Sequence, residues 1–300
     1  MQPLSTSEEA LKENPNAGRK VILFSDSRQG AARIARDLSS ASDKNLMTKL
    51  IAIAAHKVED KYADKATLEL VYPAFLDVIR KNETSVFSGD DRRRVLDDIQ
   101  TVIEELEDEE YDEALTHLPQ APAPYAQAFL ACLCDKYRTY CDASIGWIRP
   151  AKKSVRRACR RLGANDISVT EEEFESIFFA WSSYILVRNA AIDQNIDDLI
   201  KIDFMPPRAS IGIDLDNIFE GQRRGKRSLV TVLKHHFSDE QIDEISKELK
   251  RFLLPNKDTN RGHLNPKMVH LHIDPDAGWM ACPACGKIVP SALWGGVPEM

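Results

Sequence analysis

The amino-acid sequence predicts a mainly α-helical protein with one strand–loop–helix unit near the N-terminus and a short β segment near the C-terminus. Apolar residues recur at helical spacing through most of residues 45–262. Strand patterns are short and lie close to the two ends of the chain. The 300 residues are 43% hydrophobic and 29% charged, which is typical of a globular protein and excludes a collagen-like or wholly disordered chain.

The first predicted element is a buried strand at Val21–Phe24, a run of strand-forming apolar residues. A polar loop, residues 25–30, follows this strand. A helix is predicted next, because apolar side chains recur from Ala31 to Leu38 at helical spacing. One such unit cannot form a sheet by itself.

Three further helices are predicted from apolar spacing in residues 46–54, 68–79 and 91–106, the second with a kink at Pro73. The last of them ends in an acidic segment, residues 104–113, where eight of the ten side chains are acidic. We interpret this segment as a solvated helix face, and an acidic mimic of DNA is the alternative.

A linker is predicted at residues 119–124, where three prolines interrupt the helical spacing. It separates a first helical region, residues 41–118, from a second, residues 125–262. The N-terminal unit then occupies residues 1–40, and the C-terminal β segment occupies residues 263–300.

Two helices of the second helical region have N-termini defined by the sequence. Thr170 with Glu173, and Ser238 with Gln241, have the spacing of capping boxes that precede helical apolar patterns. Beyond these helices, apolar residues alternate with histidines over residues 269–273, which predicts a half-buried strand.

The net charge of −7 means that nucleic-acid binding would need a local basic surface. No apolar run approaches the roughly 20 residues that span a bilayer, and the N-terminal sequence has no secretion-signal pattern. We therefore expect a cytoplasmic protein without membrane contact, whose six cysteines stay reduced and form no disulfide framework.

One predicted helix, residues 151–162, has basic side chains on half of its circumference and Val155, Ala158, Cys159 and Leu162 on the other half. A cationic face suits a phosphate backbone, because each neutralised phosphate releases counterions. The alternatives are a solvated surface helix and a helix that binds the acidic segment of the same chain. The predicted nucleic-acid-binding residues are Lys152, Lys153, Arg156, Arg157, Arg160 and Arg161.

Cys282 and Cys285 predict a zinc half-site, because a tight Cys-x-x-Cys turn presents two thiolates to one metal ion. Zinc takes four ligands, and a second Cys-x-x-Cys pair beyond this chain is the expected completion. His270 and His272 are close in sequence, but they point the same way from one strand and are poorly placed for one metal. A redox role lacks the strand and helix that flank such motifs in thioredoxin-like proteins. Further candidate ligands are His263, Cys132, Cys134 and Cys141.

No catalytic residue is assigned, and this chain is not expected to hydrolyse ATP by itself. The sequence contains no Gly-x-x-x-x-Gly-Lys-Ser/Thr loop for phosphates. It also contains neither the Gly-x-Ser-x-Gly motif of hydrolases nor the His-Glu-x-x-His motif of zinc proteases.

Residues 20–38, KVILFSDSRQGAARIARDL, resemble the opening strand, loop and helix of the second RecA-like domain in superfamily 2 helicases. More narrowly, they are similar to a bacterial group of large DEAD/DEAH-box helicases. In that group a long helical insertion follows, and then a W-x-C-x-x-C segment that begins a four-cysteine zinc module. Residues 279–285, preceded by Leu264-Asn265-Pro266, are similar to that continuation.

The resemblance implies that residues 1–40 begin a RecA-like domain and that residues 263–300 hold part of a zinc module. It implies that Ser27 and Arg28 contact the nucleic-acid backbone, which a hydroxyl, a guanidinium and helix N-terminal amides are suited to do. The alternative is that Ser25 or Ser27 only caps the helix. The complete protein would bind ATP between two RecA-like domains.

Residues 211–215 and 222–227 resemble two later helicase segments, GIDI and the arginine-finger motif QR-x-GR. They lie too close together to accommodate the strand and helix that separate these segments in the family, and Lys226 stands where an arginine is expected. We therefore interpret residues 222–227 as a second, smaller basic cluster in a loop of the insertion.

Our interpretation of the sequence is an incomplete part of an ATP-dependent DNA helicase or translocase that contributes nucleic-acid contacts and a zinc half-site. Its expected partners are DNA and the rest of the helicase polypeptide or a neighbouring subunit. The alternative is a non-enzymatic helical adaptor that binds nucleic acid or protein through the basic helix and a zinc knuckle.

Overall fold

The chain separates into two compact units, Met1–Leu46 and Met47–Met300, and the sites discussed below belong to the second unit. For residues 28–44, 102–107 and 294 the backbone alone is described. The predicted strand at Val21–Phe24 lies outside the described residues. The computed structural model describes residues 28–82, 86–107, 120–192, 196–205, 210–223, 228–256, 258–281 and 287–294.

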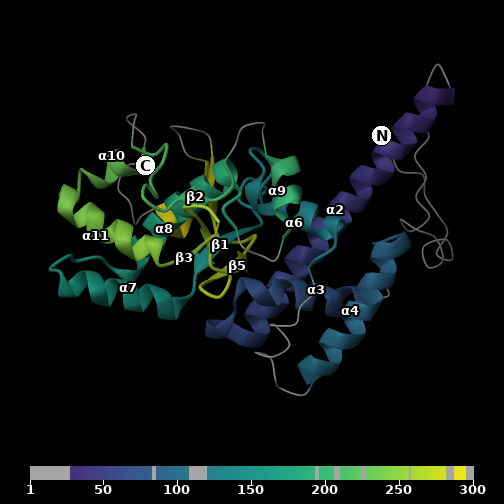
Figure 1. Ribbon diagram of the computed structural model, residues 1–300, viewed down its shortest axis with the longest axis horizontal. Coiled ribbons are helices and arrows are strands. Elements are labelled where there is room, and N and C mark those ends of the chain that lie inside the picture. The colour runs from purple at the N-terminus through teal and green to yellow at the C-terminus, as the bar shows by residue number, and fades with distance from the viewer. Residues whose placement is uncertain are drawn as a thin grey trace. The chain divides into compact units, whose positions relative to one another are not determined.

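The described part of the protein is mainly α-helical, as the sequence predicts (Figure 1). Two short 3-10 turns, η2 (Ala63–Lys65) and η3 (Leu68–Leu70), connect α2 to α3. The α-helices are α2 (Arg28–Tyr62), α3 (Val71–Lys81), α4 (Gly89–Glu107), α6 (Ala123–Cys134), α7 (Lys152–Ala164), α8 (Glu171–Asn189), α9 (Asp198–Phe204), α10 (Leu229–Leu233), α11 (Asp239–Lys250) and α12 (Ser291–Trp294).

The described strands are short, and their ladders are antiparallel. They form one three-stranded and two two-stranded sheets. β1 (Gly146–Pro150) pairs with β5 (Val269–Ile273), β4 (Arg261–Leu264) lies between β2 (Ile213–Asp214) and β3 (Leu253–Pro255), and β6 (Trp279–Ala281) pairs with β7 (Ile288–Pro290).

The strand predicted at residues 269–273 is confirmed as β5. Val269 and Leu271 are buried on one of its faces, and His270 and His272 are partly buried on the other. The alternation of apolar and polar residues places the two histidines side by side on one face, because successive side chains of a strand point in opposite directions.

Two helix predictions are wrong in detail. α2 is one continuous helix, whereas the sequence pattern suggested one helix that ends near Leu38 and another that begins near Asn45. The Ser and Ala residues between them do not break a helix. Pro73 does not kink a helix, because it lies in the first turn of α3, where a missing N–H deprives no carbonyl of an intrahelical partner.

The N-termini of α8 and α11 are confirmed. Thr170 and Glu173 form a reciprocal capping box for α8, and Ser238 and Gln241 form one for α11. α6 begins at Ala123, within the linker predicted at residues 119–124, and carries a proline in its first turn.

One hydrophobic core extends through most of the second unit. It includes aromatic side chains of α3, α6 and α8, and the indole N–H of Trp181 donates to the carbonyl of Ile218 at 2.9 Å. Leu264, Val269 and Leu271 of β4 and β5 belong to the same core. A separate small cluster joins side chains of β1, α8 and α12. Among the described residues, no helix combines the length and apolar composition needed to cross a membrane.

Candidate functional site

The helix predicted to be basic is α7, and the structure confirms its two-sided character. Val155, Ala158 and Leu162 are at most 1% exposed and pack into the main core. The predicted nucleic-acid-binding cations lie on the opposite side, where all but Arg161 are exposed. Whether they bind nucleic acid stays a prediction.

Three cations of α7 are paired with acidic side chains. Arg161 makes the tightest of these contacts, since its Nε and Nη2 bind the Glu248 carboxylate of α11 at 2.7 to 2.9 Å. Lys152 lies 3.1 Å from Asp64, and Arg156 lies 3.6 Å from Glu171. These acids neutralise half of the basic face, and Arg161 joins α7 to α11.

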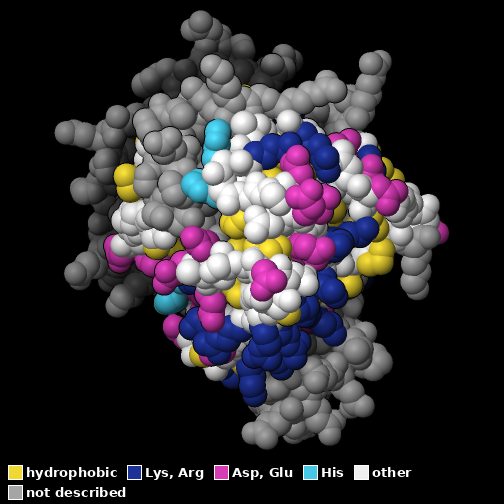
Figure 2. Space-filling view, turned by 90° about the vertical axis from the view of Figure 1, so that its left-hand side faces the viewer, with side chains coloured by type: hydrophobic (Ala, Val, Ile, Leu, Met, Phe, Trp, Pro, Cys, Tyr) yellow, Lys and Arg dark blue, Asp and Glu magenta, His cyan; other side chains and the backbone are white. Residues whose placement is uncertain are grey.

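The other three cations, Lys153, Arg157 and Arg160, form no ion pair with any residue that the structure describes. Their spacing of four and three residues places them along one stripe of the helix. Figure 2 shows Lys and Arg side chains gathered on the lower part of the face where α7 lies. We call Lys153, Arg157 and Arg160 the α7 cation stripe.

Several predicted site residues lie outside the described part of the chain. They are Ser27, Cys282 and Cys285, so the zinc half-site stays a prediction. Arg28 is the first residue of α2, and only its backbone is described. In the second basic cluster, Arg223 donates to Asn217 at 3.1 Å, and residues 224–227 lie outside the description.

Among the residues that the structure describes, the cysteines considered as extra zinc ligands form no group of three potential ligands with a histidine or acid. Cys132 and Cys134 are buried in α6, and burial raises the pKa of the Cys132 thiol to about 12. The thiol of Cys141 donates to the carbonyl of Ile288 at 3.1 Å, and burial raises its pKa to about 12 as well. High thiol pKa values disfavour the thiolate that zinc requires.

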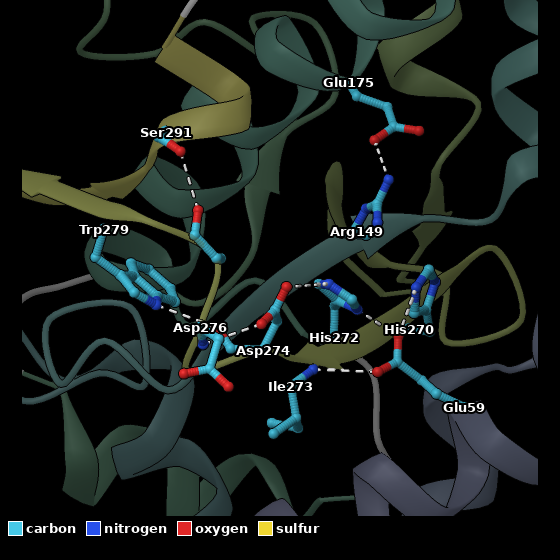
Figure 3. Close-up of polar contacts among 11 residues, drawn as sticks. Glu59, Arg149, Glu175, His270, His272, Ile273, Asp274, Asp276, Trp279 and Ser291 are labelled. Carbon is cyan, nitrogen blue, oxygen red and sulfur yellow. Dashed lines mark hydrogen bonds and ion pairs between the residues drawn. The ribbon is translucent and has the colours of Figure 1, made fainter.

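The structure instead gathers His270 and His272 of β5 around Glu59 in the last turn of α2 (Figure 3). Glu59 Oε1 lies 2.7 Å from His272 Nδ1 and 3.2 Å from His270 Nε2. The backbone N–H of Ile273 donates to Glu59 Oε2 at 3.2 Å. We call Glu59, His270 and His272 the histidine cluster. Among the described residues, it is the one group of His, Cys, Asp or Glu with three potential ligand atoms within 4.8 Å of one another.

The neighbouring side chains determine the charge of Glu59 and the packing of His272. Burial opposes ionisation of Glu59, but hydrogen bonds from His270 and His272 outweigh it and lower the Glu59 pKa to about 2. Arg149 of β1 lies opposite His270 in the sheet register, and its guanidinium turns to Glu175 at 2.6 Å. The ring of Trp147 packs edge-on against His272 with centroids 4.6 Å apart.

The sequence could identify two members of this cluster but not the third. His270 and His272 were recognised as neighbours on one strand face, and no sequence signal linked them to Glu59. That residue is 213 positions away from His272 and lies in a different element. Only the packing of α2 against β5 brings the three together.

One curated protein shows similarity to almost the whole chain. Druantia protein DruE of Escherichia coli (strain UMEA 4076-1) is 27% identical over 295 residues. The match covers 94% of this chain but only 15% of DruE, so the chain spans a small part of that protein's length. No protein-family model and no solved structure matches the chain.

Proposed function

We propose that this chain is the DNA-holding part of a longer, helicase-related protein. In this proposal the α7 cation stripe contacts the phosphate backbone, and the ATP-hydrolysing parts lie elsewhere in the complete protein. The observation that carries the proposal is the stripe itself, three exposed cations in line without acidic partners among the described residues.

The charge distribution supports a backbone contact in spite of the net charge of −7. The three cations span about 10 Å of helix, since each residue advances the helix by about 1.5 Å. Cations at this spacing can each neutralise a phosphate and release its counterion, a contribution that does not depend on the base sequence. The chain would then bind DNA without sequence specificity.

Two further observations support a place in a helicase-related protein. The match to DruE covers nearly all of this chain and a small part of DruE, as expected for one segment of a longer polypeptide. The FSDSRQGAA segment and the later W-x-C-x-x-C segment resemble, in the same order, two motifs of large DEAD/DEAH-box helicases.

The first prediction concerns the salt dependence of DNA binding. In Lys153→Gln/Arg157→Gln/Arg160→Gln, three phosphate contacts are lost. The plot of log K against log salt for duplex DNA should therefore become less steep by about 2.7, at about 0.9 per contact. Fluorescence anisotropy of a labelled duplex at several salt concentrations measures both slopes.

The matched control removes the same number of charges away from α7. Arg80→Gln/Lys81→Gln/Arg92→Gln changes exposed cations of α3 and α4 and should retain the slope of the unmodified chain. Equal loss in both triple variants would indicate a general charge effect. That result, or binding by the α7 variant that equals the unmodified chain, would refute the proposed interface.

A further inference from the structure

We infer that the histidine cluster, Glu59, His270 and His272, binds one divalent transition-metal ion and that Zn²⁺ is its expected occupant. This site is distinct from the predicted half-site at Cys282 and Cys285. It does not depend on the proposed DNA-binding function, because it is argued from a separate group of side chains.

The distances from Glu59 to the two histidines fit a metal centre after a small adjustment. Zinc binds nitrogen and carboxylate oxygen at about 2.0 to 2.2 Å, so ligand atoms around a tetrahedral ion lie about 3.3 Å apart. Glu59 Oε1 and His270 Nε2 are already 3.2 Å apart. His272 Nδ1, at 2.7 Å from Glu59 Oε1, would move away by about 0.6 Å. A side-chain rotation achieves a shift of this size.

The donor set suits zinc. Two imidazoles and one carboxylate, with the fourth position left to water, form a recurring zinc-binding combination. The three side chains are 15 to 21% exposed, so water can reach the ion while the surrounding protein holds the ligands. Hard ions such as Mg²⁺ prefer all-oxygen sites, which disfavours them here.

The neighbouring groups hold the ligands as the outer shell of a metal site does. Ile273 N–H binds Glu59 Oε2 and leaves Oε1 facing the two rings. Asp274 Oδ2 lies 3.9 Å from His272 Nε2, the ring nitrogen that faces away from Glu59. At that distance, which is too long for a hydrogen bond, the carboxylate acts on the ring through its charge alone.

The arginine that lies opposite His270 in the sheet does not oppose a metal ion. Arg149 is the cross-strand neighbour of His270, and a free guanidinium there would repel a dication. Its Nη2 lies 2.6 Å from Glu175 Oε2, so the pair carries no net charge. Figure 3 shows the Arg149 head group directed to Glu175.

The test uses the full 300-residue chain with Cys282→Ser/Cys285→Ser, which removes the competing thiolates. Cobalt(II), a spectroscopic substitute for zinc, is titrated to one equivalent, and Zn²⁺ affinity is measured by calorimetry. We expect stoichiometric binding with visible d–d absorption and no thiolate-to-cobalt charge-transfer band. Glu59→Gln and His270→Ala should each weaken Zn²⁺ binding more than about tenfold, which is the smallest loss typical of outer-shell changes.

His56→Ala is the matched control, because His56 is an exposed histidine of the same helix. It should leave Zn²⁺ affinity unchanged. Absence of stoichiometric cobalt binding, a thiolate band, or unchanged affinity in Glu59→Gln would overturn the inference. Glu59→Gln preserves the shape of the side chain, and the cobalt spectrum of the chain with an intact cluster decides the question even where a variant fails to fold.

Discussion

Asp98 is a buried acid whose ionisation is predicted to weaken the fold. It lies in α4 at 7% exposure, and the hydroxyl of Tyr72 in α3 donates to it at 3.0 Å. Burial raises the pKa of Asp98 above its ordinary value of 3.8, although the hydrogen bond from Tyr72 acts in the opposite direction. The protonated form is therefore better accommodated in the folded protein than the charged form.

The sign of the pH dependence follows from this raised pKa. As the pH rises past 3.8, the unfolded chain loses the Asp98 proton first, so the stability contributed by Asp98 falls until the folded-state pKa is passed. Asp98→Asn has no such titration and keeps an acceptor for Tyr72. Urea unfolding of both proteins from about pH 3 to about pH 7 should show the variant gaining stability relative to the unmodified chain. A constant difference at every pH would contradict this.

Half of the basic face of α7 is unsuited to DNA, because three of its six cations are paired with acidic side chains. Arg161 and Arg251 both bind the buried carboxylate of Glu248. A helical wheel cannot separate a cation that holds two helices together from one that faces solvent, because both lie on the same polar side. The wheel predicted six cations, and three have acidic partners supplied by other elements.

Among the helices, α8 and α11 are each expected to depend on a capping box for part of their stability. Thr170 Oγ1 accepts from the Glu173 N–H at 3.1 Å, and Ser238 Oγ accepts from the Gln241 N–H at 3.3 Å. Thr170→Ala and Ser238→Ala should each lower the free energy of unfolding by about 1 kcal/mol, because a helix N–H loses its acceptor. Denaturant unfolding measures this loss.

The conservative variants Thr170→Ser and Ser238→Thr serve as controls for the caps. Each keeps a hydroxyl at the N-cap, and the threonine at position 238 can still donate to Glu240, as Ser238 does at 2.7 Å. Both should retain the stability of the unmodified chain. Equal losses in the alanine and the conservative variants would show that capping is not the cause.

The sequence predicted those elements that are stabilised by residues close to them in the chain. The capping boxes and the alternation in β5 were found because their partners lie within a few residues. β1 was missed, because GWIRP is short and becomes a strand only by pairing with β5, more than a hundred residues later. The same reason hid Glu59, whose role depends on where the last turn of α2 packs.

In the molecule as a whole, β4 and β5 complete a hydrophobic core that begins far upstream in the sequence. β5 pairs with β1 in an antiparallel sheet, and Leu264, Val269 and Leu271 are at most 1% exposed within the main core. The carbonyl of Pro266 also accepts from the N–H of Leu68 in η3 at 3.0 Å. By contrast, β6, β7 and α12 pack around the small cluster of Trp147, Phe179 and Leu293.

This difference predicts that two truncations behave oppositely. A chain that ends at Pro255 loses the buried side chains of Leu264, Val269 and Leu271, which is about 4.5 to 9 kcal/mol at about 1.5 to 3 kcal/mol each. That loss is comparable with the whole stability of a typical domain, so this chain should show no cooperative unfolding. A chain that ends at Asp274 keeps β4 and β5 and should unfold cooperatively, with reduced stability. Circular dichroism during urea titration distinguishes them, and cooperative unfolding of the shorter chain would show that β4 and β5 are a separate module.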